Sequence, residues 1–225
     1  PGGLASWYRI AYPKATVGTL SSSGVVNPII NFDGFDKQVS AAIGNECGAR
    51  LKEISVAFEE TVIARAEFHH ARSLFNCESD MSERDFLYMI ADSWSMADQY
   101  GGKSKLCDAI LAPENPSQEV LMKTFADFSN MYWGAEFCSQ GFYNTAALSD
   151  PERWDGNSRA WRWQTCYQVA WFNTAPTEGS IRSSRVNLEY HLQQCAQVFG
   201  MKMIPATKAL NDKFGGPAPI AHNVF

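Results

Sequence analysis

Cysteine is the residue type in this 225-residue chain whose number and spacing bear most directly on chemistry. The intervals between consecutive cysteines range from 28 residues (Cys138 to Cys166) to 31 residues (Cys107 to Cys138), and no two form a Cys-x-x-Cys pair. Zinc sites usually need such close pairs, so the spacing argues against a bound metal. Separated cysteines in even number favour disulfides and an oxidising compartment, with buried free thiols in a reducing compartment as the alternative. The six are Cys47, Cys77, Cys107, Cys138, Cys166 and Cys195.

Histidine and serine are the next candidates, because together with an acidic side chain they could form a hydrolytic triad. His69 and His70 are neighbours in the sequence, so on a helix they cannot both face one site. His191 falls within a helical pattern and His222 within the C-terminal tail. The serines at 21–23 end a predicted strand and lack the strand-to-helix turn that exposes a nucleophile. We therefore expect structural roles for all of these residues.

Charge and hydrophobicity argue against two broad classes of function. The chain carries 19 Lys and Arg against 24 Asp and Glu, a formal net charge of -5, without a long basic run. Nucleic-acid binding needs a basic surface to contact phosphates, so no nucleic-acid partner is expected. No apolar segment approaches the roughly 18 residues of a membrane span, so none is expected. The length suffices for one substantial hydrophobic core.

Periodic apolar residues predict a largely helical chain. The opening Pro-Gly-Gly leads into a short helix that ends at Pro13, since glycine permits a tight turn and proline ends a helix. Residues 17–26 are small or β-branched and predict a buried strand. The most aromatic element is a predicted helix over residues 158–172. The remaining helices are predicted over residues 32–43, 51–62, 82–100, 117–132 and 188–199.

Capping residues mark the ends of several predicted helices. Ser82, with Asp85 three residues later, precedes an apolar repeat and is expected to cap it, and Ser117 stands in the same position before the next one. Gly44 and Gly200 follow the last apolar residue of their helices and are expected to end them. These local signals give the boundaries of the predicted helices.

A single predicted strand among many helices is an incomplete sheet, because a lone strand leaves its backbone hydrogen bonds unsatisfied. The chain is therefore interpreted as the middle of an α/β protein with a helical insertion.

Several segments show a specific similarity to a known family, namely PGGLASWYRIAYP, DFLYMIAD, QYGGKSKLC, WRWQTCYQVAWF and SIRSSRVNLEYHLQQCAQVFG. Through these segments the chain resembles, from Pro1 to Phe225, the serine carboxypeptidases of the prolyl-carboxypeptidase type. Lysosomal Pro-Xaa carboxypeptidase, dipeptidyl peptidase two and thymus-specific serine protease belong to that family, and its plant and protist members look most similar.

The resemblance implies an α/β hydrolase with a large helical cap. This chain would be mainly that cap, with one helix and one strand of the hydrolase sheet. Residues 1–30 would form the hydrolase segment after the nucleophile elbow, residues 31–200 the disulfide-linked helical cap, and residues 201–225 a return loop and the start of the next sheet strand. The family elbow is Gly-Gly-Ser-Tyr-x-Gly, and Pro1 and Gly2 match its last two positions. The catalytic Ser, Asp and His are thus expected outside these residues, so the chain alone is expected to be an inactive internal fragment.

The resemblance also implies how the cysteines pair and where the protein resides. The expected disulfides are Cys47–Cys107, Cys77–Cys138 and Cys166–Cys195. The first two would each close a loop of about 60 residues and stabilise the fold by about 4 kcal/mol. The implied location is secreted, lysosomal or vacuolar, and neither a cofactor nor a metal is expected.

Four residues are candidates for binding substrate, all on the basis of the resemblance. Gly2 lies at the elbow, and Gly3 matches a position that lines the pocket for the penultimate proline. Trp171 matches another pocket position, and its indole face suits a pyrrolidine ring; the alternative is that it packs in the core of an aromatic helix. Gln168 stands where many relatives have Glu and cannot pair ionically with a substrate amine, which favours a carboxypeptidase over an aminodipeptidase.

The function implied for the parent protein is a serine exopeptidase that hydrolyses peptide bonds next to proline. Its expected partners are a peptide with proline near the cleaved end and the remainder of its own hydrolase domain, with a homodimer left open. The alternative is a non-catalytic structural or interaction subunit derived from a hydrolase, since a fold does not determine a function. A binding module built on the aromatic residues 159–172 is a third alternative, which predicts that residues 31–200 fold alone.

Overall fold

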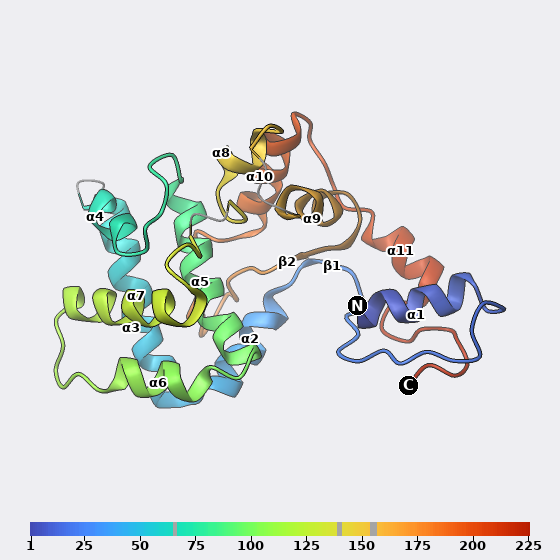
Figure 1. Ribbon diagram of the computed structural model, residues 1–225, viewed down its shortest axis with the longest axis horizontal. Coiled ribbons are helices and arrows are strands. Elements are labelled where there is room, and N and C mark those ends of the chain that lie inside the picture. The colour runs from blue at the N-terminus through green and yellow to red at the C-terminus, as the bar shows by residue number, and fades with distance from the viewer. Residues whose placement is uncertain (65–66, 139–140, 154–156) are drawn as a thin grey trace.

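The chain is mostly helical, with one small parallel sheet. A computed structural model describes residues 1–64, 67–138, 141–153 and 157–225. Figure 1 shows the two strands between a large group of helices and the pair α1 and α11, with both termini on the side of that pair. The elements are α1 (Gly2–Ala11), β1 (Ile29–Asn31), α2 (Asp33–Ile43), α3 (Asn45–Ala64), α4 (Phe68–Ser73), α5 (Glu83–Gln99), α6 (Lys103–Leu111), α7 (Gln118–Trp133), α8 (Thr145–Ser149), α9 (Ser158–Gln164), the π-helical turn η1 (Thr165–Val169), β2 (Ala170–Phe172), α10 (Leu188–Phe199) and α11 (Thr207–Phe214).

Helices α2 to α7 enclose the main hydrophobic core. Its centre is a group of aromatic rings in edge and tilted contact, in which Phe58 of α3 lies 5.5 to 6.2 Å from Phe75, Phe86 and Phe125. Trp94 of α5 adds a further ring at 5.7 Å from Phe125. Because α5 is buried along most of its length, it is the central helix of this group. The aromatic packing fixes the helices around it.

The capping residues expected from the sequence are confirmed. The Ser82 hydroxyl accepts a hydrogen bond from Asp85 N, and the Ser117 hydroxyl accepts one from Val120 N. Gly44 follows α2 with φ at 87°, and Gly200 ends α10 in the left-handed conformation. Both positions therefore require glycine, because a side chain is disfavoured at positive φ.

The buried strand expected over residues 17–26 is wrong. This segment joins the C-terminal residues through one parallel bridge, Thr19 with Val224, and Val17 and Leu20 are 93% and 73% exposed. Ser23 takes a φ of 49°, so the chain turns there instead of extending. The strand forms later, at β1, because Ile29 and Asn31 pair in parallel register with Ala170 and Phe172 of β2. The described chain thus has two short strands where one was expected.

The aromatic helix expected over residues 158–172 is wrong in its second half. Helix α9 ends at Gln164, continues as η1 and gives way to β2, since Ala170 and Phe172 make ladder hydrogen bonds with β1. The tail from residue 201, expected to be a loop, contains α11 before its strand-like end. Tertiary partners decided both segments, because the local periodicity alone favours a different structure.

The three expected disulfides are confirmed. Their Cα atoms lie 5.0 to 5.6 Å apart, within the usual range for such a bond. All three connect parts of the helical region, residues 31–200, and the third joins η1 to α10. The bonds are Cys47–Cys107, Cys77–Cys138 and Cys166–Cys195.

Candidate functional site

The start of α1 lies directly beneath the backbone of residues 22–25. A Cβ on Gly2 would overlap the Ser22 carbonyl oxygen and come within 2.7 Å of Gly24 Cα. A Cβ on Gly3 would overlap the Val25 carbonyl oxygen. Both glycines are buried, and the space that a side chain would take is filled by this neighbouring backbone. Close approach of two backbones is therefore the reason for two glycines at this place.

The first turn of α1 offers backbone groups rather than side chains. Helix α1 has no acidic residue in its first turn and no side chain that caps it among the residues described. The first N–H groups of a helix have no partner within the helix, and they lie at the positive end of its dipole. The Ser21 hydroxyl donates to the Gly2 carbonyl at 2.8 Å and accepts from Ser6 at 2.8 Å, which holds residues 21–25 on the helix. This end of α1 is suited to stabilising a negatively charged oxygen.

Trp171 is the centre of a stack of aromatic side chains from four elements. Its ring lies 6.2 Å from Trp7 of α1, nearly parallel at 10°, and 6.3 Å from Trp161 of α9. Trp7 in turn stacks on Phe214 of α11 at 5.6 Å. The Trp171 indole N–H donates to the Asn27 carbonyl at 3.0 Å, so its orientation is fixed by the chain that leads into β1. The stack joins the helical region to α1.

The backbone at Trp171 is strained. Ala170 and Trp171 have φ values of 55° and 52°, a conformation that side chains with a Cβ rarely adopt. They follow a π-helical turn, and both features are common at functional sites, where the surrounding structure holds them in place. Sequence inspection indicated the aromatic residues here but not the strain, because no glycine marks it.

The four predicted substrate residues do not form one cluster. Gly3 and Trp7 lie one turn apart on α1, so Gly2, Gly3 and Trp171 belong to the same part of the molecule through α1 and the chain at 22–27. Gln168 is exposed on η1, and its side chain makes no hydrogen bond to another described residue. The geometry therefore brings Trp171 and the α1 glycines together and leaves Gln168 outside.

A buried ionic network, which the sequence analysis missed, supports β2 and α10 from the other side. The guanidinium of the fully buried Arg182 donates to both oxygens of Asp36, at 2.7 and 2.9 Å, and to Asp92 at 3.1 Å. Burial raises the pKa of the Asp92 carboxyl, and the charge of Arg182 opposes this rise. Burial and then the charge of Asp92 raise the pKa of Tyr88. Asp36 and Arg182 are 146 residues apart, so no sequence motif contains them.

His191 is also part of the buried interior. Its Nε2 donates to the Asn173 carbonyl at 2.9 Å, which leaves Nδ1 to accept from Arg162 at 3.2 Å. Burial lowers the pKa of this imidazole well below its ordinary value, and the charge of Arg162 lowers it further. The ring stacks on Phe172 of β2 at 5.0 Å. A neutral, enclosed histidine of this kind orients its neighbours and has no exposed nitrogen for acid–base chemistry.

Comparison with known proteins identifies the family. A sequence model of the family described as Serine carboxypeptidase S28 matches residues 1–225. The chain belongs to this family. It is 31% identical to the "Probable serine protease EDA2" of Arabidopsis thaliana over 222 residues, which are 96% of this chain and 44% of that protein. It is 22% identical to the thymus-specific serine protease of Homo sapiens over 262 residues, which cover all of this chain and 49% of that protein.

The family gives the site its chemical context. The chain spans about half the length of these serine protease relatives, so it corresponds to one part of such a protein. The described residues of this chain contain no group of three or more His, Cys, Asp or Glu placed to hold a metal ion. None of the helices described is both long and apolar enough to cross a membrane. The mostly helical structure with its small sheet agrees with the expected helical cap.

Proposed function

We propose that this chain is the specificity-determining part of a serine exopeptidase that cleaves peptide bonds next to proline. The observation that carries the proposal is the aromatic stack around Trp171, which stands beside the helix that begins at Gly2. A flat indole face binds a pyrrolidine ring well, because both are apolar and rigid. Trp171 would contact the proline ring, and Gly3 would let the Val25 backbone lie close to α1.

The first turn of α1 would serve the reaction through its backbone. In acyl transfer by a Ser-His-Asp triad, serine attacks the carbonyl carbon, histidine accepts and returns the proton, and aspartate orients the histidine. The triad residues would come from the remainder of the protein. The N–H groups at the start of α1 would face the oxygen that becomes negative in the tetrahedral intermediate. Gly2 has no side chain, which lets the backbone of residues 22–25 lie against this turn.

The remainder of the hydrolase domain would pack on the apolar residues of the terminal segments. Several large apolar side chains there are exposed, among them Leu20, Ile220 and Phe225. An exposed apolar surface of this extent is typical of an interface. Three disulfides support a secreted, lysosomal or vacuolar location, since such bonds persist in oxidising compartments.

The proposal is tested on the full-length protein with a fluorophosphonate probe and two classes of peptide. Covalent labelling of one serine is expected, together with hydrolysis of a peptide whose penultimate residue is proline. A peptide with a blocked N-terminus and a free C-terminal carboxylate tests the carboxypeptidase form. A peptide with a free N-terminus and a reporter group in place of its C-terminal carboxylate tests the aminodipeptidase form. Absence of labelling would contradict catalysis and favour the non-catalytic subunit.

Substitution at the stack tests the role of Trp171. Trp171→Ala is expected to raise KM for the proline peptide about tenfold, while an alanine peptide changes little, because one aromatic contact to the ring is lost. Trp163→Ala is the matched control, since Trp163 is a half-exposed tryptophan that instead stacks on Tyr167 and meets Phe199 edge-on. Equal effects on the two peptides would assign Trp171 to packing alone.

A further inference from the structure

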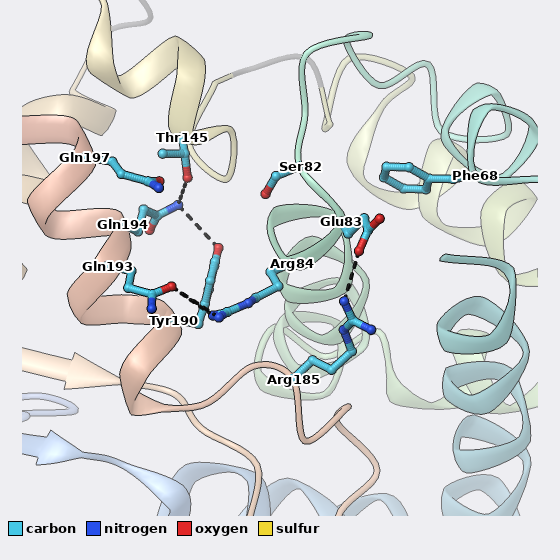
Figure 2. A pocket seen from close by; sticks show the side chains of 10 residues that line it. All are labelled: Phe68, Ser82, Glu83, Arg84, Thr145, Arg185, Tyr190, Gln193, Gln194 and Gln197. Atoms are coloured by element: carbon cyan, nitrogen blue, oxygen red, sulfur yellow. Dashed lines mark hydrogen bonds and ion pairs between the residues drawn. The ribbon is translucent and has the colours of Figure 1, made fainter. Parts of the chain in front are cut away.

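A polar cavity of about 510 Å³ lies between α10, the start of α5 and α4, away from the α1 glycines. Figure 2 shows Gln193, Gln194 and Gln197 on one wall, Arg84 in the centre and Phe68 opposite. Hydroxyl groups of Ser82, Thr145 and Tyr190 complete its polar lining. The sequence analysis did not single out any of these side chains as a site.

Arg84 is the cation of this cavity without an acidic partner. Both of its terminal nitrogens donate to Gln193 Oε1 at 3.2 Å, and its guanidinium lies 5.6 Å from the centre of the Tyr190 ring. No carboxylate within the described part of the chain pairs with Arg84. By contrast, Arg185 at the edge of the cavity is paired with Glu83 at 2.9 Å. A neutral amide is a weak partner for a guanidinium, so an incoming carboxylate would replace it favourably.

The charge of the cavity differs from that of the whole chain. Its lining contains two arginines and one glutamate, a formal charge of +1 from Arg84, Arg185 and Glu83, while the chain carries -5. The buried acid beneath the cavity does not contribute a free acceptor. Asp85 accepts hydrogen bonds from Thr145, from Tyr190 at 2.8 Å and from Gln194 at 3.0 Å. The charge in the cavity that a ligand could neutralise is therefore that of Arg84.

The glutamines suggest the shape of the ligand. Gln193 and Gln197 are exposed and four residues apart on α10, which places them about 6 Å apart along the helix. An extended peptide repeats every two residues, or about 6.6 Å, so two such amides can each meet one peptide unit on the same side. A glutamine amide can donate to a carbonyl and accept from an N–H at once. Gln194, by contrast, is buried and engaged with the protein interior.

We propose that this cavity is a docking site for an extended acidic peptide segment. Gln197 would bond the peptide backbone, and Arg84 would bind a glutamate or aspartate side chain of the ligand. Gln193, whose Nε2 donates to Glu189 at 2.8 Å, would offer the peptide its Oε1 once the ligand carboxylate replaces it at Arg84. Phe68 offers an apolar wall for a neighbouring side chain. The site selects acidic segments because a neutral peptide leaves the guanidinium of Arg84 with only its amide partner.

Binding is measured on the full-length protein by fluorescence anisotropy. The probe is a labelled five-residue peptide without proline, acetylated and amidated at its ends, with either Glu or Gln in the middle. The Glu peptide is expected to bind about tenfold more tightly than the Gln peptide. Arg84→Gln is expected to abolish this difference and leave the Gln peptide unaffected. Lys123→Gln, on α7 and paired with Asp127, is the matched control and is expected to retain it.

Two outcomes would overturn the proposal. Equal binding of the two peptides is one, and a Glu preference that survives Arg84→Gln is the other. Inorganic sulfate and the variant Gln197→Ala distinguish a simple anion site from a peptide site. A simple anion site would bind sulfate, and its affinity would not change in Gln197→Ala. In a peptide site, Gln197→Ala weakens the binding of both peptides severalfold. Because the probes carry no proline and no free end, these results are independent of the fluorophosphonate experiment. The comparison of Glu and Gln peptides on the unaltered protein requires no variant to fold.

Discussion

The helical region, residues 31–200, and the terminal layer, residues 1–30 with 201–225, differ in how far they bury their own apolar side chains. The helical region encloses the ring cluster of Phe58, Phe86 and Phe125 and contains all three disulfides. In the terminal layer, the buried apolar side chains among the described residues are Pro28, Met203, Pro205 and Phe214. The helical region is therefore stabilised from within, whereas the terminal layer depends on contacts with its neighbours.

The difference shows which of the two regions is stabilised by its own contacts. The terminal layer contacts the helical region through Trp7 on Trp171, through Met203 in the cluster with Phe172 and through the hydrogen bond from Ala206 N to the Tyr167 carbonyl. Its own ends join through the bridge of Thr19 with Val224. The first turn of α1, which would serve the reaction, lies in the terminal layer, the region with fewer buried apolar side chains. The helical region can thus hold the aromatic stack in place while the adjoining layer packs against it.

Loss of Arg182 should give the largest effect, because it removes the charge at the centre of the helical region. Arg182→Met leaves Asp36 and Asp92 buried without their cation and is expected to lower the free energy of unfolding by about 3–5 kcal/mol. Urea unfolding followed by circular dichroism measures the change. The control, Arg185→Met, breaks a partly exposed pair with Glu83 and should cost less than about 1 kcal/mol. Similar losses from both would show that the network is not specially stabilising.

Removing the stack should loosen the terminal layer alone. Trp7→Ala deletes the half-buried ring between Trp171 and Phe214, and a local loss of about 2 kcal/mol is expected. Amide hydrogen exchange should then accelerate in residues 17–25 and in α11, while α5 keeps its protection. Faster exchange in α5 as well would mean that the two regions unfold together.

Acid should weaken the helical region through His191. Because burial and Arg162 hold its pKa well below 6.5 in the folded protein, the unfolded chain binds one more proton once the pH falls below that value. Stability attributable to His191 is full above about pH 6.5 and decreases toward its folded pKa, by about 1 kcal/mol between pH 7 and 5.5. The measurement is urea unfolding across this range for the unaltered protein and for His191→Gln. In His191→Gln, the free energy of unfolding should no longer show this part of its dependence on pH. His69→Gln, at an exposed position, should keep the pH dependence of the unaltered protein.

The smallest effect is expected at the junction of the two regions. Ala170→Gly relieves the strain of a φ of 55° and should raise stability by about 0.5–1 kcal/mol. Ala109→Gly, in the last turn of α6, is the control and should lower stability by up to about 1 kcal/mol. Thermal unfolding measures both. A loss at Ala170 would show that this backbone is not strained in the way its φ indicates.

The local features of the fold were predictable from the sequence. The serine caps at Ser82 and Ser117 and the glycine end at Gly200 depend on residues within one turn of each other, so they can be recognised in the chain. The disulfide pairing followed from the family resemblance, since spacing alone left the pairing open. Trp171 was singled out as a substrate contact, which stays a prediction, and its stacking partners were not indicated.

Only the tertiary structure decided the features whose partners are distant in sequence. Strands of three residues, such as Ile29–Asn31, are too short to show a period of two, and β2 replaced the end of a predicted helix because β1 offers it hydrogen bonds. The buried charges of Asp36 and Arg182 are tolerable only where they meet, and Arg84 faces the glutamines of α10 only through the packing of α5. Sequence by itself determined several of the helices, their caps and the residue types available for chemistry. Folding decided which of them came together, because burial and convergence are properties of the whole packed chain.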